Sequence, residues 1–463
     1  MIFLLALLLL PIAASAQQGS PPMDRALARE IYAELVETNT THSVGSTTTA
    51  AEKMAARLRA AGFLPEDVLV VEPFPAKGNL VARYRGTGAR RPIVLLAHLD
   101  VVEARPEDWS LDPFAFTERD GYFYGRGTTD DKAMAAIWVA TFIQLRRERF
   151  VPDRDLILAL TADEEGGDRN GVDWLLQNRR DLVDAAYALN EGGGGQLRGG
   201  KRILNEVQTT EKVYQTFTVE ARNPGGHSSL PRPDNAIYRL AQALTRLAAH
   251  DFPVHLNETT RLFFGRMAAI EGGSAAADMR AVTRDPIDPA AAARLSASSA
   301  YYRAMLRTTC VATMLAAGHA ENALPQSARA TVNCRLVPGE TPEAVGATLI
   351  RVLADTGLTV TPVGVARPSA PSPLTPDVMG PIERITAAMW PGVPVVPTMV
   401  SGATDGLYFR NAGIPTYGVS GLFEEIDDVR AHGRDERMGV EAFFEGHEYL
   451  YRLVKALSVP TSP

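Results

Sequence analysis

Short apolar runs alternate with segments of helical periodicity through the first half of this chain. A chain that alternates strands with helices folds into an α/β structure, a mostly parallel sheet with helices on both faces. The expected strands are residues 79–84, 92–97, 155–161 and 185–189, and the expected helices are residues 24–37, 48–61, 132–147 and 171–178.

The pattern changes near residue 212. Residues 213–221 and 329–336 alternate apolar with polar side chains, which is typical of antiparallel strands with one solvated face. With 463 residues, 46% of them hydrophobic, the chain is long enough for more than one domain. We therefore expect an α/β catalytic domain interrupted by an inserted α+β lid or dimerisation domain. The expected parts are residues 17–211 and 368–463 for the catalytic domain and 212–367 for the insertion, with a helix at 235–250, further helices and loops over 275–317, a linker at 368–373, a helix at 377–390 and a strand at 394–399.

The first residues are typical of an export signal. Residues 1–16 combine an apolar run with the small residues Ala14, Ser15 and Ala16, so we expect cleavage after Ala16. The run has about ten apolar residues, whereas a membrane-spanning helix needs ~20, so we expect no stable membrane anchor. The protein is therefore predicted to be exported, either to a periplasm or out of the cell.

Charge and cysteine content narrow the classes of function. The chain has 54 acidic and 47 basic residues, a net charge of −7, which leaves no basic excess for a nucleic-acid partner. Cys310 and Cys334 are the only cysteines, too few for a zinc cluster held by thiolates. An oxidising compartment permits a disulfide between them, and the sequence leaves that pairing open. Any bound metal must be held by histidines and carboxylates.

A histidine and several carboxylates follow the expected strands at the points where they end. Ligands gather beyond the carboxyl ends of strands in open α/β sheets. Each residue alone has a structural explanation, such as a core histidine or a solvated loop carboxylate. Crowded together, however, the carboxylates would repel one another without a cation between them, and zinc suits this mixture of side chains. The residues are His98 and Asp100 after the second strand, Asp130 before the 132–147 helix, Glu164 and Glu165 after the third strand, and Glu191 after the fourth.

A pair of divalent ions would need a shared ligand. Two zinc ions about 3.5–4 Å apart require a bridging carboxylate and further ligands on each ion. We expect Asp130 to be the bridge and His432 to be the second histidine, although spacing alone also allows a surface-loop role for His432. Asp100 lies two residues after His98, on the same face of an extended segment, so it can hydrogen-bond the ring nitrogen that a metal leaves free. The expected cofactor is two Zn²⁺ per chain, with Co²⁺ or Mn²⁺ as substitutes.

Six short motifs occur in series along the chain. They are HLDVV at 98–102, GRGTTDDK at 125–132, ADEEGG at 162–167, NEGG at 190–193, GGHSS at 225–229 and AHGRDER at 431–437. Together they resemble the zinc-dependent carboxypeptidase/aminoacylase family that includes glutamate carboxypeptidase, carboxypeptidase S and succinyl-diaminopimelate desuccinylase. The resemblance covers most of the chain after the leader, and it is specific for the family rather than for a substrate.

The resemblance implies which residues bind each metal. His98 and Glu191 would hold one ion, Glu165 and His432 would hold the other, and Asp130 would bridge the two. His432 would thus come from the other side of the insertion and complete the set.

The resemblance also implies which residue transfers protons during catalysis and which residue supports a metal ligand. Glu164 would be the general base that takes a proton from water and passes it to the leaving amine. Asp100 would support His98. The peptide bond between Asp130 and Asp131 is commonly cis in the family, and we expect the same here.

The substrate side of the site follows from the same resemblance. His227 would stabilise the oxyanion, often of a neighbouring subunit's site. Asn322 and Arg335 would hold a free carboxylate of the substrate, a task that suits the planar fork of arginine. The loop carrying Gly402 and Thr404 would meet the same carboxylate. Read from the residues alone, His227 is equally a turn residue and Arg335 equally a partner in a surface ion pair.

The resulting hypothesis is a di-zinc hydrolase that cleaves an amide or peptide bond next to a free carboxylate. Its substrate would be a small peptide or an N-acyl-amino acid. The alternatives are a dipeptidase or aminopeptidase of the same family, a non-catalytic exported peptide-binding protein, and a metallohydrolase of phosphate esters. Both a monomer and a homodimer through the inserted domain remain open. We assign structural or surface roles to the remaining histidines, His42, His250, His255, His319 and His447.

Overall fold

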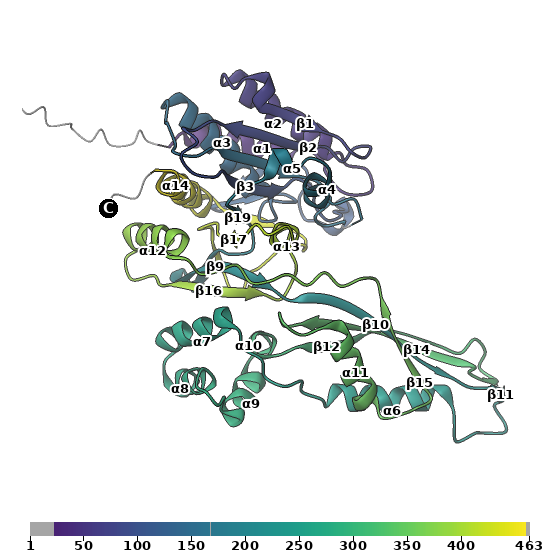
Figure 1. The fold of residues 1–463 in the computed structure, drawn as a ribbon. Helices are drawn as coiled ribbons and strands as arrows, with labels where there is room; N and C mark the ends of the chain where they lie inside the picture. Colours follow the sequence, from purple (N-terminus) through teal and green to yellow (C-terminus); the bar gives the residue numbers. More distant parts are fainter. Residues whose placement is uncertain (1–22, 167, 460–463) are drawn as a thin grey trace, which may run out of the picture.

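The computed structural model describes residues 23–166 and 168–459. The expected signal peptide, residues 1–16, lies outside these ranges. Figure 1 shows a large α/β part that contains both ends of the described chain, and an elongated part, built from the middle of the chain, that extends away from it. Within the described ranges, no helix is long and apolar enough to cross a membrane.

A ten-stranded sheet forms the centre of the α/β part. Strands β6, β3, β7 and β17 are parallel neighbours, and β16 pairs in parallel with β9. The expectation of a mostly parallel sheet is therefore confirmed. The strands, in sheet order, are β1 (Val68–Val71), β2 (Asn79–Tyr84), β6 (Leu156–Thr161), β3 (Ile93–His98), β7 (Tyr187–Asn190), β17 (Thr416–Gly418), β9 (Lys201–Glu211), β8 (Gly195–Arg198) and β18 (Phe423–Glu425), with β16 (Val395–Val400) joined to β9.

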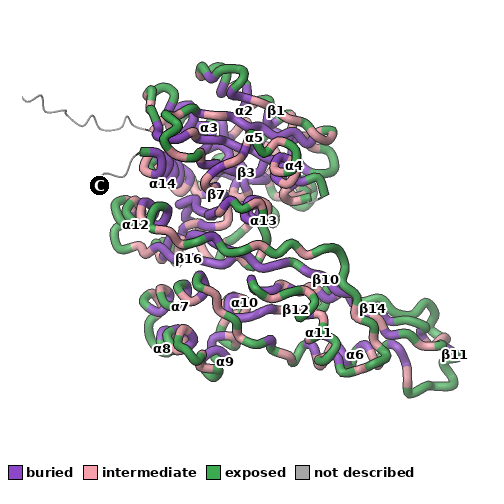
Figure 2. The backbone as a smooth tube through the Cα atoms, in the orientation of Figure 1, coloured by how far each residue is buried: buried purple, intermediate pink, exposed green. Residues whose placement is uncertain are grey.

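Helices cover both faces of this sheet, because its central strands are apolar on both sides. Leu95 and Leu158 face one core, whereas Val94 and Ile157 face the other. Figure 2 shows that the buried segments concentrate in and around this sheet. The first face carries α1 (Arg25–Val36), α2 (Thr47–Ala60), α3 (Lys132–Arg147), α12 (Pro376–Met389) and α14 (Val440–Leu457), and the second carries α4 (Gly171–Asn178), α5 (Arg180–Val183) and α13 (Gly406–Asn411).

A small three-stranded sheet links two loops that are distant in sequence. Its central strand pairs with a strand from near the C-terminus, which brings the segments around residues 125 and 436 together. The strands are β19 (Arg437–Gly439), β5 (Tyr122–Tyr124) and β4 (Thr117–Arg119), and the 3₁₀ helices of the α/β part are η1 (Pro65–Asp67) and η2 (Pro106–Asp108).

The elongated part is a four-stranded antiparallel sheet, which we call the lid sheet. The two strands expected from alternating side chains, β10 and β14, pair along their whole lengths. Helices α6 and α11 pack on one face and share a separate apolar core with the strands. The elements are β12 (Thr309–Ala317), β14 (Ser327–Leu336), β10 (Val213–Arg222), β15 (Leu358–Val363), α6 (Ala236–Ala248) and α11 (Pro342–Leu353), with the short pair β11 (Gly226–His227) and β13 (Ala323–Leu324) at the end of the lid farthest from the α/β part (Figure 1).

Strand β12 corrects one sequence expectation. We expected helices and loops throughout residues 275–317, but residues 309–317 form an edge strand of the lid sheet. This alanine-containing segment is extended because its backbone pairs along β14. Pairing in the tertiary structure thus overrides the intrinsic helix preference of alanine.

Four helices of the middle segment share an apolar core with β9 and β16 of the central sheet, and this core is separate from the core of the lid sheet. Helix α7 contacts β16 and β9, and its Phe263 and Phe264 share a core with Leu204 and Val396. In Figure 1 these helices lie beside β16, next to the lid. They are α7 (Glu258–Ile270), α8 (Gly273–Val282), α9 (Pro289–Ser298) and α10 (Ala300–Leu306).

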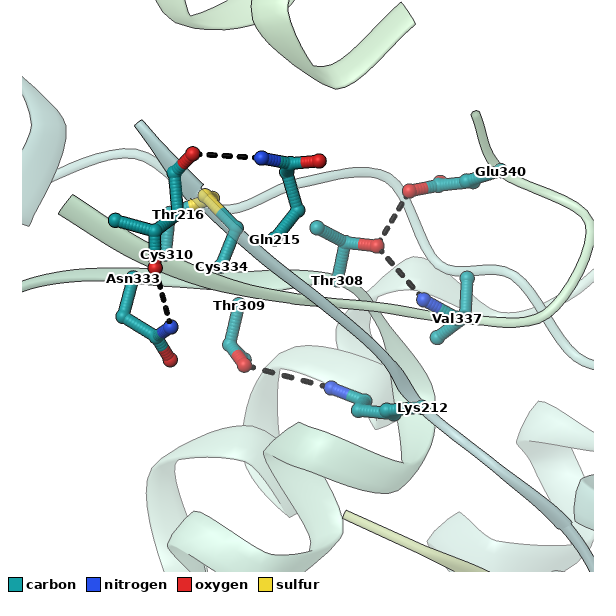
Figure 3. The surroundings of a disulfide bond; sticks show 10 residues. All are labelled: Lys212, Gln215, Thr216, Thr308, Thr309, Cys310, Asn333, Cys334, Val337 and Glu340. Atoms are coloured by element: carbon teal, nitrogen blue, oxygen red, sulfur yellow. Dashed lines mark hydrogen bonds between the residues drawn. A yellow bond between two sulfur atoms is a disulfide. The ribbon is translucent and has the colours of Figure 1, made fainter. Parts of the chain in front are cut away.

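A disulfide joins two strands of the lid sheet near its connection to the α/β part. Cys310 of β12 and Cys334 of β14 lie directly opposite each other and are bonded, as Figure 3 shows. In the same region the Nζ of Lys212, between β9 and β10, donates a hydrogen bond of 2.7 Å to the carbonyl of Arg307. The pairing that the sequence left open is therefore present, and it closes the base of the lid.

Candidate active site

The first group of potential metal ligands lies where β3 and β7 end. His98 is the last residue of β3, Glu191 follows β7, and Asp130 lies just before α3. Because β3 and β7 are parallel neighbours, their carboxyl ends meet at one edge of the sheet. His98 Nε2 lies 2.8 Å from Asp130 Oδ1 and 4.0 Å from Glu191 Oε2. One ligand atom from each residue lies within 4.8 Å of the others, close enough to bind a single ion.

The second group shares Asp130. His432 Nε2 lies 3.1 Å from Asp130 Oδ2 and 2.8 Å from Glu165 Oε1, and these three residues also bring ligand atoms within 4.8 Å of one another. The two oxygens of one carboxylate therefore face two different histidines. The peptide bond from Asp130 to Asp131 is cis, as expected.

The residues present fit a pair of divalent ions. Glu165 Oε1 is buried and accepts no hydrogen bond of good geometry, although His432 lies beside it. Such an arrangement is expected when both side chains direct lone pairs to a common ion. Burial also raises the pKa of Glu191 well above its usual value, with Asp130 adding to the shift and His98 opposing it. A cation would relieve this crowding of negative charge.

Glu164 lies beside the two groups without belonging to either set around Asp130. It forms a third candidate ligand group with His98 and Glu165, whose ligand atoms also lie within 4.8 Å of one another. Burial raises the pKa of Glu164 well above its ordinary value; nearby His98 opposes the shift, and Asp405 adds to it. A buried carboxylate with a raised pKa, next to the two groups that share Asp130 but in neither of them, is suited to accept and release a proton.

Asp100 supports the site in a different way from the one expected. The Nδ1 of His98 lies 2.9 Å from the backbone carbonyl of Asp100, whereas the Asp100 carboxylate is 3.8 Å away. That carboxylate instead accepts hydrogen bonds from the backbone N–H groups of Glu164 and Glu165, at 3.1 and 3.0 Å. The difference arises because the loop after β6 presents two backbone donors to Asp100, and these are not visible in the sequence. Asp100 therefore orients His98 through its backbone and the Glu164 loop through its side chain.

Buried hydrogen bonds also hold the loop that follows β6 and carries Glu164. Asp163 accepts hydrogen bonds from the Nζ of Lys77, at 2.5 Å, and from the backbone N–H of Arg169, at 2.8 Å. Asp405 accepts hydrogen bonds from Thr161 and Asn170. These residues were missed by the sequence analysis, except that Asp163 falls within the ADEEGG motif.

Glu436 is the most extensively bonded residue around the site, and sequence reasoning missed it. It is fully buried. Its carboxylate accepts hydrogen bonds from Arg126 Nη1 at 2.6 Å and from the backbone N–H groups of Gly127, Thr129 and Asp130. It thereby ties the loop of Asp130 to the loop of His432. The available signal was its place in the AHGRDER motif, four residues after His432.

Thr404, which we expected to bind the substrate carboxylate, is hydrogen-bonded to the carboxylate of Glu211. Its backbone N–H and hydroxyl both donate to Glu211 Oε2, at 3.2 and 3.0 Å, and Arg410 lies 2.9 Å from the same oxygen. Gly402, by contrast, leaves open space beside its backbone, with only Val400 near the position of an added Cβ. Glu211 is the last residue of β9, so these hydrogen bonds attach the 401–405 loop to the end of β9, next to the lid.

The remaining expected substrate residues lie on the lid. His227 is exposed on β11, at the far end of the lid in Figure 1, and the adjacent Ser228 donates a backbone hydrogen bond to the carbonyl of Asn322. Arg335 stacks on Tyr214, with its guanidinium carbon 4.7 Å from the ring centroid. Within the described chain, none of the hydrogen bonds or ion pairs connects these residues to the metal ligands. The structure therefore brings the metal-ligand candidates together and leaves the lid residues apart from them.

Comparison with known proteins agrees with this geometry. Residues 94–456 match the family described as "Peptidase family M20/M25/M40". The chain belongs to this peptidase family. Among M20-related proteins, it is 31% identical to the N-fatty-acyl-amino acid synthase/hydrolase PM20D1 of Xenopus tropicalis over 362 residues, which are 76% of this chain and 69% of that protein. It is 28% identical to the probable carboxypeptidase S-like 2 of Dictyostelium discoideum, over 82% of this chain and 74% of the other.

Solved structures of M20 proteins share the fold. The M20 metallo-carboxypeptidase Sso-CP2 of Sulfolobus solfataricus superposes with a TM-score of 0.68 at 17% identity, covering 93% of this chain and 99% of that one. A dinuclear metal-binding M20 peptidase from Bacillus subtilis gives a TM-score of 0.60 at 13% identity, covering 94% and 97%. The protein is thus an M20 metallohydrolase with a candidate dinuclear site of histidine, aspartate and glutamate.

Proposed function

We propose that this protein is a di-zinc hydrolase that cleaves an amide or peptide bond next to a free carboxylate. The position of Asp130 carries the proposal, because its two oxygens face His98 and His432 from separate ligand groups. His98 and Glu191 would hold one zinc ion, and Glu165 and His432 the other. Histidine and carboxylate ligands in groups of three suit catalytic zinc, which keeps a further position for water or substrate.

One residue of the site would transfer the proton, and two others would keep the reacting groups in position. When bound, the two ions would lower the pKa of a water molecule and polarise the scissile carbonyl. Glu164 would take the proton from that water and deliver it to the leaving amine. Asp100 would keep Glu164 in place through the backbone of the loop, and Glu436 would hold Asp130.

An N-acyl-amino acid or a peptide with a free C-terminus fits this reaction. In both substrates a carboxylate lies next to the amide that is cleaved, and the relatives named above act on N-acyl-amino acids or are carboxypeptidase-like. We assign that carboxylate to Asn322, Arg335 and Gly402, and to Thr404 once its N–H and hydroxyl exchange Glu211 for the substrate. Arg335 supports this assignment, since the described structure shows it stacked on Tyr214 with no ion pair to an acidic residue.

A homodimer through the inserted domain is part of the proposal. Strand β11, which contains His227, lies in Figure 1 at the far end of the lid from β3, which ends at His98, so a second chain would have to supply His227. The edge strand β12 offers a surface for this contact, because Val311, Met314 and Leu315 are 60–69% exposed. Mixing inactive Glu164→Ala and His227→Ala chains should restore part of the activity if His227 acts across subunits, because some mixed dimers then contain one intact site.

Export and the domain limits are also proposed. The leader-like residues 1–16 support export to a periplasm or beyond the cell, and so does the disulfide between Cys310 and Cys334, since such bonds persist in oxidising compartments. N-terminal sequencing of protein recovered after expression of the full chain should begin at Gln17. The strands of the lid sheet fall within the proposed insertion, residues 212–367.

One experiment tests the central proposal. Purified protein, loaded with zinc and counted for metal, should hydrolyse members of a panel of N-acyl-amino acids, dipeptides and longer peptides with free carboxyl ends. Amidated versions of the same compounds should be poor substrates, because they lack the carboxylate. Two zinc ions per chain without hydrolysis of any compound would instead support the peptide-binding alternative.

A further inference from the structure

A cavity of about 830 Å³ extends from the metal site along the central sheet. Asp130 and Glu191 line one part of it, the glycines at 192–195 form a floor without side chains, and helices α7 and α10 contribute another wall. This volume is in the range of pockets that enclose small-molecule ligands. Because the cavity begins at the metal ligands, a group attached to the scissile amide can enter it.

The wall built by the helices is largely apolar and aromatic. It includes Leu204 of β9, Phe263 and Met267 of α7, and Tyr301 and Tyr302 at the start of α10. Phe263 contacts both tyrosine rings, with centroids 5.8 and 6.5 Å apart, and Leu204 and Met267 belong to the same core. The wall is therefore preformed by packing and would accept an apolar stem.

Glu206 on this apolar surface lacks a basic partner within the described chain, as does Glu424 on another part of the cavity wall. Glu206 lies two residues after Leu204 on β9, so the two side chains share a face of the sheet. Its Oε1 atom is buried without a hydrogen-bond partner. Burial raises the pKa of Glu206 to about 7, with only a hydrogen bond from Gln196 opposing the shift.

Another carboxylate on the cavity wall, Glu271, does have protein partners and serves as a comparison. Glu271 is 3.1 Å from the Nη2 of Arg198 and accepts a hydrogen bond from the hydroxyl of Tyr302 at 3.2 Å. Glu271 is therefore satisfied within the wall, whereas Glu206 lines the same cavity with one carboxylate oxygen that is buried and unbonded. A buried carboxylate without a partner costs free energy, and a ligand cation would recover that cost.

We propose that this cavity binds the acyl side of the substrate and selects a chain with a primary ammonium at the end of an apolar stem, which pairs with Glu206. The inference rests on the proposed function and adds to it the class of acyl group. An ω-aminoacyl group or a lysine-like side chain has this form. A plain alkyl chain would fill the apolar wall but leave the Glu206 carboxylate unpaired.

The first test compares matched substrates. N-acyl derivatives of one amino acid, with unbranched acyl chains of four, six and eight carbons, are paired with analogues that carry a terminal amine. We expect the best amine-bearing chain to exceed its plain counterpart by at least ~10-fold in kcat/KM. In the isosteric variant Glu206→Gln, the ratio of kcat/KM on amine-bearing chains to that on plain chains should fall to about one. Glu66→Gln, at an exposed carboxylate on η1, should keep the wild-type ratio and serves as the control. Equal or better rates on plain chains at every length, with no change of the ratio in Glu206→Gln, would overturn the inference.

A binding measurement separates this inference from the proposed function. Calorimetric titration of the wild type and Glu206→Gln with n-hexylamine and n-hexanol needs no turnover. The amine should bind more tightly than the alcohol to the wild type only. If no substrate is hydrolysed but this difference is present, the proposed function fails and the amine site stands. If the two probes bind alike to both proteins, the amine site is refuted whatever the activity.

Discussion

The Glu436 carboxylate accepts a 2.6 Å hydrogen bond from the guanidinium of Arg126, and both side chains are almost wholly buried. This pair joins the loop before α3 to the loop that carries His432. Removing one partner of a buried ion pair typically costs ~3–5 kcal/mol, since the other charge is left uncompensated. The position of Asp130 between the two candidate ligand groups is therefore supported by Glu436, which hydrogen-bonds the Asp130 backbone but belongs to neither group.

Substituting this positioning residue should weaken the metal site without removing a ligand. In Glu436→Gln, we expect zinc affinity to fall by ~10–100-fold, because outer-shell partners tune metal binding to about that extent. Competition with a chelator of known affinity would measure the change, and excess zinc should restore most of the activity. Unaltered zinc affinity in a folded variant would show that Glu436 contributes only to stability.

The adjacent glutamates should separate into different roles. Glu164→Gln should retain two zinc ions and lower kcat by ~10²–10⁴-fold, the usual contribution of a general base. Glu165→Gln, its neighbour in sequence, should instead lose zinc. Elemental analysis would measure the zinc content of the two variants, and single-turnover kinetics would measure their chemical step. Each variant serves as the control for the other. Wild-type kcat in Glu164→Gln, or zinc loss from it, would contradict the assigned role.

Metal removal should abolish hydrolysis reversibly. Dialysis against a chelator is expected to eliminate activity, and Zn²⁺, Co²⁺ or Mn²⁺ should restore it, since the ligands suit each ion. His98→Ala and His432→Ala should each bind at most one zinc ion per chain in place of two. His319→Ala, an exposed histidine of the lid, is the matched control. Activity that survives complete metal removal would exclude the metal-dependent reaction.

Buried His447 should make the stability of the protein depend on pH. Neither of its ring nitrogens has a hydrogen-bond partner in the described structure, and burial lowers the pKa of His447 to about 3. Its folded pKa thus lies below the unfolded value near ~6.5, so the unfolded state binds the proton more readily below that pH. The contribution to stability is complete above pH ~6.5 and falls by ~2 kcal/mol at pH 5.

The pH effect can be isolated with a substitution. Urea unfolding of metal-free protein at pH 7 and pH 5 should show a smaller stability difference for His447→Leu than for the wild type, by the same ~2 kcal/mol. The exposed variant His319→Leu should behave like the wild type. An identical pH dependence in His447→Leu would show that other groups account for it.

The disulfide should stabilise the base of the lid. Cys310 and Cys334 are 24 residues apart in sequence, and closing a loop of that size contributes ~3 kcal/mol in the chain-entropy description. In a Cys310→Ser/Cys334→Ser variant, hydrogen exchange should increase in β12 and β14 while the central sheet keeps its protection. Unchanged exchange in both strands would show that their pairing alone is sufficient.

Much of the α/β part could be predicted because strand and helix periods are local properties. The expected strands at 79–84, 92–97, 155–161 and 185–189 correspond closely to β2, β3, β6 and β7. Strand β12 could not be predicted in this way, since its extended form depends on pairing with β14. The role of the Asp100 carboxylate was also out of reach, because it depends on backbone donors of a loop that follows a different strand.

By itself, the sequence determined which side chains are available and that they come at the ends of strands, where an α/β sheet gathers its ligands. Only the tertiary structure decided that the two oxygens of Asp130 face different histidines, that Glu436 binds the loops together and that Glu206 lacks a basic partner. The reason is physical: residue type and periodicity belong to neighbouring residues, whereas contact and burial arise when segments distant in the chain pack together.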